Sequence, residues 1–360
     1  MSNGPGRLET IDRTRGIAVL LMTVDHAREA FMANPLIGDP IAPGVSDSLF
    51  LTRWVTHICA PTFALLAGMS LALMAVNLRM TPGRTAKVAF VKGAGLIALE
   101  ALVVSGFWRM SWPPDPMALG VLWALGAGFL ALGFAAFLPR SAMLPLGLAA
   151  GASGALSNVV HSWPSGHLGH HAVQALFVSG VPLIGGAAFV HYPPIPWIGV
   201  MLLGYWLGGS PWIGRERSRV RAFSAMGAAS LAAAAGLVAA AWLYGRPPGT
   251  DVEPLWRAAL NAKKYPPSPT FLTLTLALSF FALAAFERRP KAVPDVLGNY
   301  GRAPLAYYVA HLALLFTLAW STGLRTESVG GVWAIAFGAA TLLYPTPHVQ
   351  RMLKTRKRQP

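Results

Sequence analysis

Residues 12–26 read DRTRGIAVLLMTVDH, an apolar run that starts among charged residues and ends on an acid and a histidine. Eleven positions separate Arg15 from His26. In an α-helix this is about three turns, so both side chains share one face and lie about 16 Å apart along the axis. The run predicts a membrane-spanning helix, in which ionisable groups are costly and are therefore functional candidates. The alternative is a polar pair that only binds neighbouring helices together.

The composition extends this prediction to the whole chain. Of its 360 residues, 54% are hydrophobic and 12% are charged, and the mean hydropathy is +0.50. Apolar runs of membrane-spanning length recur along the sequence. We therefore predict an all-α, polytopic membrane helical bundle that forms a single domain over residues 1–360. The predicted helices lie near 16–34, 51–77, 87–107, 117–138, 141–160, 195–213, 222–244, 269–286, 303–322 and 329–345.

The distribution of basic residues predicts the topology. The formal net charge is +15, and most Lys and Arg residues fall in connections that alternate helices place on one side. This positive-inside pattern predicts a multi-pass protein of the cell inner (plasma) membrane, with the lipid bilayer rather than a nucleic acid as its partner. About ten spans place both termini in the cytoplasm, with 1–15 and 346–360 as basic tails.

One stretch leaves the number of spans open. Residues 172–190 are apolar enough to cross a membrane, which would make eleven spans, but they contain Gly180, Pro182 and two further glycines. A full span here would also move the basic residues of 215–221 to the outer side. We therefore favour an outer loop over 161–194 with a re-entrant or interfacial element.

The second predicted helix carries another histidine. Arg53 and His57 are four residues apart and share a face, so His57 and His26 are expected to face one cavity from neighbouring helices. The alternative is an interfacial His57 that bonds to a carbonyl group. Asp25 adjoins His26 but points about 100° away around the helix. We expect Asp25 to pair with Arg28 or with another helix rather than to orient His26 directly.

A metal site is not predicted. The outer loop is rich in histidine, but no carboxylate or cysteine lies beside these residues, and Cys59 is the single cysteine of the chain. A solvated loop explains this composition equally well. The histidines concerned are His161, His167, His170, His171 and His191.

Five ordered motifs resemble the bacterial heparan-α-glucosaminide N-acetyltransferase-like family of transmembrane acyltransferases. They are IDRTRGIA (11–18), RWVTHICAP (53–61), PWIGVM (196–201), KYPPS (264–268) and LGNYGRAPL (297–305). The Arg-x10-His spacing also resembles that of the broader acyltransferase-3 group, in which that histidine is taken as catalytic. The resemblance implies transfer of an acyl group, usually acetyl, from cytoplasmic acyl-CoA to a hydroxyl or amine of a sugar or glycan on the outer face.

The residue chemistry agrees with this implication. Acyl transfer from a thioester needs a base near neutrality, for which histidine is the usual choice. We assign His26 as the base or nucleophile, with His57 and Asp25 as further catalytic candidates. The diphosphate of CoA needs cations on the cytoplasmic side, for which we assign Arg15 and Arg302. The candidates for acceptor binding are Arg53, Tyr265, Tyr308 and His311.

A second hypothesis comes from a different class of protein. A proton-coupled transporter or flippase of a small metabolite or lipid-linked sugar would use Asp25, His26 and His57 as a proton relay. The two halves of the chain show no convincing repeat, which such transporters often have. The sequence leaves open which sugar is the acceptor, whether an oxygen or a nitrogen is acylated, and whether the protein is a homo-oligomer.

Overall fold

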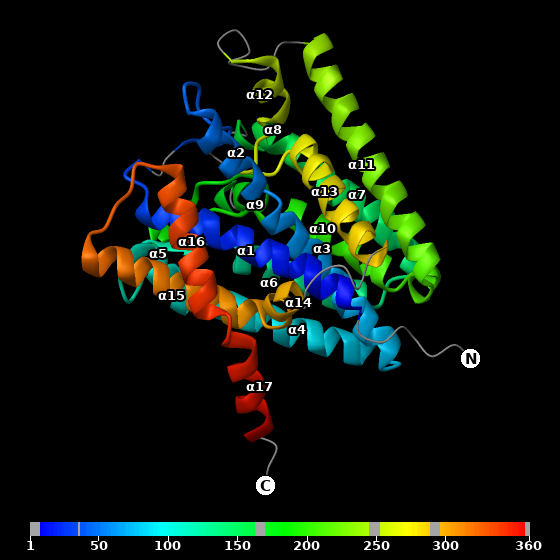
Figure 1. Ribbon diagram of the computed structural model, residues 1–360. Helices are drawn as coiled ribbons and strands as arrows, with labels where there is room; N and C mark the ends of the chain where they lie inside the picture. Colours follow the sequence, from blue (N-terminus) through cyan, green and yellow to red (C-terminus); the bar gives the residue numbers. More distant parts are fainter. Residues whose placement is uncertain (1–7, 35–36, 163–169, 245–252, 289–295, 357–360) are drawn as a thin grey trace.

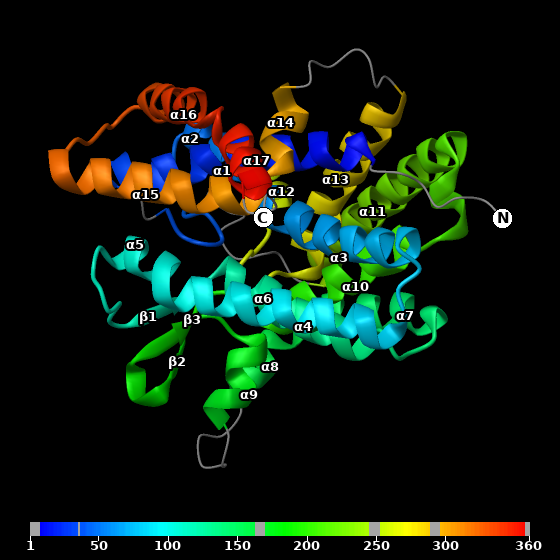
Figure 2. The same ribbon diagram turned by 90° about the horizontal axis from the view of Figure 1, so that it is seen from below.

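The computed structural model describes residues 8–34, 37–162, 170–244, 253–288 and 296–356, and helices dominate this part of the chain (Figures 1 and 2). The helices are α1 (Glu9–Phe31), α2 (Asp47–Thr56), α3 (Cys59–Asn77), α4 (Pro82–Leu99), α5 (Ser105–Arg109), α6 (Val121–Ala135), α7 (Met143–Ala152), α8 (Ser157–His161), α9 (His170–Phe177), α10 (Pro194–Gly208), α11 (Glu216–Tyr244), α12 (Leu255–Leu260), α13 (Pro269–Arg288), α14 (Val296–Arg302), α15 (Pro304–Thr322), α16 (Val329–Leu343) and α17 (Thr346–Arg356). Three short strands are β1 (Met117–Leu119), β2 (Val181–Leu183) and β3 (Ala188–Val190).

Several helices have the dimensions of membrane spans. Within the described residues, seven helical stretches are long and apolar enough to cross a bilayer. α6 and α10 are apolar but have only 15 residues each, and α1 has 23 residues and carries charges. All ten predicted helical segments contain a helix, so the polytopic all-α prediction is supported. The number of spans and the sides on which the termini lie stay predictions.

The stretch 172–190 is not a single span. α9 ends at Phe177 and is followed by β2 and β3, which pair with each other as antiparallel strands, with Val181 opposite Val190. β3 also pairs in parallel with β1, so the sheet order is β1-β3-β2. An eleventh span through this stretch is therefore excluded, because a membrane-crossing helix needs about 20 consecutive helical residues.

One predicted helix begins later than expected. The helix expected from residue 117 begins at Val121, and the preceding residues form β1. The buried carboxylate of Glu100 accepts the backbone amides of Leu122 and Trp123, so a side chain from the neighbouring helix satisfies the first turn of α6. Glu100 itself begins a π-helical turn, Glu100–Val104, between α4 and α5.

The helix expected over 51–77 is divided into α2 and α3. The break falls at His57 and Ile58. Pro61 has no amide hydrogen and cannot donate to the carbonyl of His57, which removes the hydrogen bond that a continuous helix would need there. The side chain of His57 consequently lies at the end of one helix rather than within a longer one.

The tail predicted over 1–15 is wrong for its second half. α1 begins at Glu9, and Thr10, Ile11 and Asp12 are already buried. These residues pack where α1 crosses α14, so they belong to the bundle. At the other end of the chain, residues 346–356 of the predicted tail form α17, which projects from the body of the molecule in Figure 1.

The core is centred on α10, which packs against α3, α6 and α7. The crossing with α3 is close because both helices place glycine at the contact. A Cβ atom on Gly68 would lie 2.0 Å from the carbonyl oxygen of Met201, and one on Gly204 would lie 2.0 Å from that of Leu65. On the other side of the molecule, α1 packs against α14, α15 and α16. The space that remains between these two groups of helices contains the candidate site.

Candidate functional site

A cavity of about 650 Å³ lies between α1, α3, α4, α6 and α15. Arg15, Ser70 and Lys92 line it, and so do Asp25 and His26, which lie about three turns farther along α1. The cavity therefore extends along the stripe that the sequence predicts on α1. Its wall is mainly apolar and is provided by side chains such as Met22, Phe63, Leu96, Val121, Leu125 and Phe129.

Arg15 is held at one end of this cavity. Its Nη2 donates to Ser70 Oγ at 2.8 Å, and its Nη1 donates to the carbonyl oxygen of Gly301 at 3.2 Å. The crossing of α1 with α14 makes the second contact possible, because a Cβ atom on Gly301 would lie within 2 Å of the α1 backbone. Lys92 of α4 lies close enough to Arg15 for their charges to repel each other. Two cations thus meet at this end of the cavity, together with the carboxylate of Asp12, which pairs with Arg15 Nη1 at 3.3 Å.

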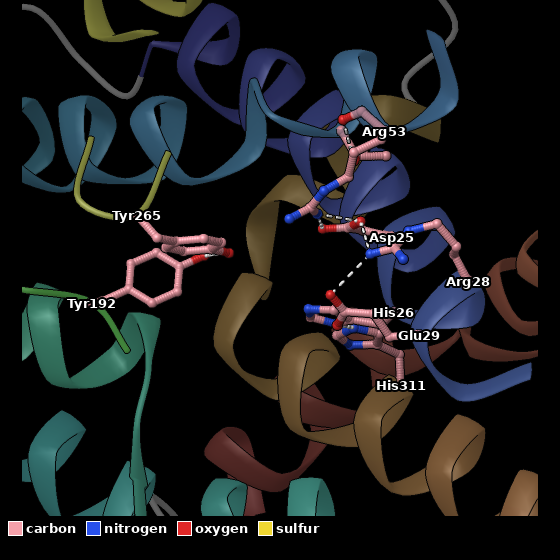
Figure 3. Close-up of polar contacts among 9 residues, drawn as sticks. Asp25, His26, Arg28, Glu29, Arg53, Tyr192, Tyr265 and His311 are labelled. Atoms are coloured by element: carbon pink, nitrogen blue, oxygen red, sulfur yellow. Dashed lines mark hydrogen bonds and ion pairs between the residues drawn. The ribbon is translucent and has the colours of Figure 1, made fainter. Parts of the chain in front are cut away.

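His26 forms a pair with His311 of α15. His26 Nδ1 lies 2.6 Å from His311 Nε2 (Figure 3). His311 Nδ1 lies 3.0 Å from the carbonyl oxygen of Tyr307. A carbonyl oxygen can only accept, so we assign the hydrogen of His311 to Nδ1 and leave its Nε2 as an acceptor. His26 then donates from Nδ1, so the lone pair of its ring lies on Nε2, and the residue lines the cavity.

Aromatic rings fix the orientation of His26. The indole ring of Trp108 meets the imidazole edge to face at a centroid distance of 5.2 Å, and the ring of Tyr308 meets it at 5.9 Å. Tyr308 also lines the cavity. Trp108 was not among the predicted site residues, since nothing in its local sequence places it beside α1.

Asp25 lies within a buried network of ion pairs. Its two carboxylate oxygens accept from Arg53 Nη1 at 2.6 Å, and Oδ1 also accepts from Arg28 Nη2 at 3.2 Å (Figure 3). Arg28 further contacts Glu29 at 3.0 Å. The expectation that Asp25 pairs with Arg28 or with another helix is thus confirmed. Arg53, predicted to bind the acceptor, does not line the cavity, because Asp25 engages its guanidinium group.

His57 does not face His26. It is buried, with 4% of its surface exposed, and its ring packs edge to face against Phe271 at 5.4 Å. Within the described residues, its Nε2 has no hydrogen-bond partner. His57 thus lies against α13 and does not line the cavity. His311, predicted as an acceptor-binding residue, takes the position beside His26 that we expected of His57.

A group of polar side chains lies at the other end of the cavity. Tyr192, just before α10, and Lys264, before α13, both line it. The hydroxyl groups of Tyr192 and Tyr265 are 3.0 Å apart (Figure 3). The Lys264 ammonium lies 5.0 Å from the ring centroid of Tyr265. Burial and the neighbouring Tyr265 raise the pKa of Tyr192 well above its ordinary value, so the phenol is neutral.

The connection between α1 and α2 supports this end of the site. Both carboxylate oxygens of Asp39 accept the backbone amide of Lys264, each at 3.0 Å. Burial raises the pKa of the Asp39 carboxyl, and the amide of Lys264 acts in the opposite direction. Sequence reasoning noted KYPPS as a motif but assigned no role to its lysine.

The remaining predicted site residues are placed as follows. Arg302 ends α14 next to Gly301, which contacts Arg15, but Arg302 does not line the cavity. Among the described residues, no group of three or more His, Cys, Asp or Glu side chains is arranged to hold a metal ion. In the histidine-rich loop, the rings of His170 and His171 contact each other, and the ring of His191 lies 4.2 Å from that of Tyr265. His167 lies outside the described residues.

Comparison with known proteins identifies the family. A sequence model of the family described as "Heparan-alpha-glucosaminide N-acetyltransferase, catalytic" matches residues 7–244, which is more than half of the chain. No curated protein matches significantly. The match includes Arg15, His26 and Lys92 and ends before Lys264 and His311. The resemblance inferred from the motifs is confirmed, and the chain belongs to the heparan-α-glucosaminide N-acetyltransferase catalytic-domain family.

Proposed function

We propose that the protein is a transmembrane acyltransferase that moves an acyl group, in the simplest case acetyl, from cytoplasmic acyl-CoA to a hydroxyl or amine of a sugar at the outer face. The observation that carries this proposal is the cavity. It joins two cations suited to phosphate at one end to a histidine with an available ring nitrogen about 16 Å away. Membership of an acetyltransferase family supports the same chemistry.

The end at Arg15 suits the acyl donor. The phosphate groups of CoA are anionic and bind guanidinium and ammonium groups through charge-assisted hydrogen bonds. Arg15 and Lys92 line the cavity, whereas Arg302, which the sequence also suggested for this role, does not. An extended pantetheine arm is long enough to reach from these cations to His26, and the apolar wall between them suits its aliphatic parts.

The positive-inside rule orients the site. α3 ends and α4 begins around the basic residues Arg79 and Arg84, and this turn lies on the same side as Arg15, because Arg15 contacts Ser70 in the second half of α3. Basic connections face the cytoplasm, so we place the donor end there and the end with Tyr192 and Lys264 outside. The protein is accordingly assigned to the inner membrane as a single multi-pass domain.

The chemistry proceeds through His26. In direct transfer, Nε2 removes the proton of the acceptor hydroxyl or amine, whose oxygen or nitrogen attacks the thioester carbonyl. The carbon–sulfur bond then breaks, and the imidazolium returns the proton to the departing sulfur, which yields free CoA thiol and the acylated sugar. In the alternative, Nε2 attacks the thioester carbonyl, the carbon–sulfur bond breaks and CoA leaves as a thiolate. The acceptor then attacks the acyl-histidine, the carbon–nitrogen bond breaks to restore neutral His26, and the acceptor's proton goes to the thiolate. His311 acts as a positioning residue in both routes, because it fixes the tautomer of His26.

The test is acyl transfer by the purified protein in detergent. [14C]Acetyl-CoA is incubated with a panel of sugars and amino sugars, and both labelled product and released CoA thiol are measured. Cys59 is the single cysteine, so the protein itself adds at most one thiol per chain, which a control without acetyl-CoA subtracts. We expect acceptor-dependent thiol release equal to the product formed. Absence of acyl-CoA binding together with absence of thiol release for every acceptor would contradict the proposal.

A transporter is the second candidate, and the buried ion pairs of Asp25 with Arg28 and Arg53 are the observation in its favour. Charged groups inside a membrane often form proton relays. A transporter would take up sugar into proteoliposomes in response to a proton gradient without any acyl donor. Uptake of this kind would favour the second candidate, and donor-dependent acylation without uptake would exclude it.

A further inference from the structure

Lys264 is a buried cation that the proposed reaction does not yet use. Only 3% of its surface is exposed, and it lines the cavity that contains His26. Its ammonium lies over the rings of Tyr265 and Tyr192, at 5.0 Å and 5.8 Å from their centroids. Aromatic faces attract a cation, but they do not replace a counter-ion.

The carboxylates near this end of the site are already engaged. Asp25 accepts from Arg53 and Arg28, and Glu29 accepts from Arg28. Asp39 accepts the backbone amide of Lys264 rather than its ammonium. Within the described residues, no ion pair joins the Lys264 ammonium to a carboxylate. The charges of Asp25 and Asp39 act on Lys264 only from beyond ion-pair distance, so an anion that enters the cavity and contacts the ammonium directly gains a charge-assisted hydrogen bond that these carboxylates do not make.

The backbone around Lys264 holds the side chain in place. The Lys264 amide is tied to Asp39 in the connection after α1, and the Ser268 amide donates to the Lys263 carbonyl at 2.9 Å. The Tyr192–Tyr265 hydroxyl contact joins the segment before α13 to the segment before α10. Three connections thus converge on one ammonium group, which makes this a built subsite rather than an exposed lysine.

The position of Lys264 separates it from the donor cations. Arg15 lies in the second turn of α1, His26 lies three turns farther on, and Asp39, which holds Lys264, follows the end of α1. Lys264 therefore lies on the side of His26 opposite to the cations assigned to CoA phosphates. The partner of Lys264 is consequently expected on the acceptor rather than on the donor.

We infer that Lys264, Tyr192 and Tyr265 form an acceptor subsite and that the acceptor is an anionic sugar whose carboxylate or phosphate pairs with the Lys264 ammonium. This inference rests on the proposed function. The tyrosine hydroxyls offer hydrogen bonds to sugar hydroxyls and the rings offer apolar faces, as in sites that combine an aromatic body with a polar tip. The shared requirement is negative charge, which a uronic acid and a sugar phosphate both supply.

The test compares matched acceptors that differ in charge. Methyl glucoside is compared with methyl glucuronide, and glucosamine with glucosamine 6-phosphate, in the acetyl-transfer assay. We expect kcat/KM of the wild type to be at least tenfold higher for the anionic member of a preferred pair. Preference for the glucuronide identifies the carboxylate as the partner of Lys264, and preference for glucosamine 6-phosphate identifies the phosphate.

Two variants distinguish the effect of the Lys264 charge from a purely structural role of its side chain. Lys264→Met keeps the length of the side chain without its charge, and we expect it to raise KM for the anionic acceptor by at least tenfold while the neutral acceptor is little affected. Lys264→Arg keeps the charge and should retain the preference. A Lys264→Met variant that lowers kcat equally for both members of each pair would overturn the inference, because Lys264 would then act at the reacting carbonyl. Equal wild-type use of charged and neutral acceptors would overturn it as well.

A binding measurement keeps this inference distinct from the proposed function. Titration calorimetry of the purified protein uses methyl glucuronide and glucosamine 6-phosphate as probes, without any acyl donor. Binding that is lost in Lys264→Met but kept in Lys264→Arg supports the subsite even if no acetyl transfer is found, in which case the acyltransferase proposal alone fails. No difference between wild type and Lys264→Met in binding either probe contradicts the subsite, whatever the activity.

Discussion

His26 lies on α1 and His57 directly follows α2. Both are buried, with 9% and 4% of their surfaces exposed, but their surroundings differ. His26 lines the cavity and is oriented by a second histidine, whose own hydrogen is fixed by a backbone carbonyl. His57 packs against Phe271 outside the cavity. The difference teaches that an intramembrane histidine becomes a candidate catalyst through access to a cavity and a defined tautomer, and that burial alone is insufficient.

The difference between the two histidines is tested most directly by replacing each of them with glutamine. We expect His26→Gln to lower kcat by about 10²–10⁴-fold, which is the usual contribution of a general base. His57→Gln should change kcat by no more than about threefold, or less than 1 kcal/mol. The measurement is acceptor-dependent CoA thiol release, with size-exclusion profiles to verify that both variants fold. Equal losses in the two variants would remove the distinction between the two sites.

The second prediction concerns the contribution of the ion pairs beside His26 to the stability of the folded protein. Asp25→Asn leaves Arg53 and Arg28 without their buried carboxylate, and breaking a buried pair in this way costs about 3–5 kcal/mol. We expect a marked fall in the thermal unfolding temperature in detergent.

The matched control is Glu9→Gln, which breaks the pair with Arg13 in which Glu9 is 66% exposed. An exposed ion pair contributes about 0–1 kcal/mol, so this variant should unfold close to the wild-type temperature. If Asp25→Asn were as stable as Glu9→Gln, the buried network would not hold this part of α1 in place.

A further prediction tests whether the cations at the donor end of the cavity bind acetyl-CoA. Arg15→Ala and Lys92→Ala should each raise KM for acetyl-CoA about tenfold or more, since hydrogen bonds to charged groups contribute about 1.5–3 kcal/mol. The acceptor KM should be unchanged. Arg302→Ala serves as the control, because Arg302 does not line the cavity. A larger effect in Arg302→Ala than in Lys92→Ala would move the donor site toward α14.

A further prediction concerns the residue that orients His26. His311→Phe removes the acceptor for the His26 Nδ1 hydrogen and should lower kcat about 10-fold to 100-fold, as expected for an outer partner that fixes a ring tautomer. His311→Asn can accept the same hydrogen through its amide oxygen and should recover part of the loss without a change in KM for acetyl-CoA. Equal activity in the two variants would show that the ring fills space and does not set the tautomer.

Much of the first helix was predictable from its own residues. The spacing of Arg15 and His26 along one helix follows from the helical repeat alone, and so does the separation of Asp25 from the His26 face. The predicted pairing of Asp25 with Arg28 is local, because the two residues are three positions apart. The roles of Lys92 and Lys264 were not predictable in this way, because neither residue carries a local sign that it faces the cavity beside α1.

What the sequence by itself determined is the class of fold and the stripe of α1, because hydropathy and helical periodicity act within one segment. Only the tertiary structure decided which groups meet that stripe. His311 reaches His26 across 285 positions, and Lys264 is held by Asp39 across 225. Such contacts depend on how the helices cross, at glycine contacts such as that of Gly301 with α1 and at breaks such as the one before Pro61. No periodicity within a single segment encodes that geometry, because it depends on how separate segments pack together.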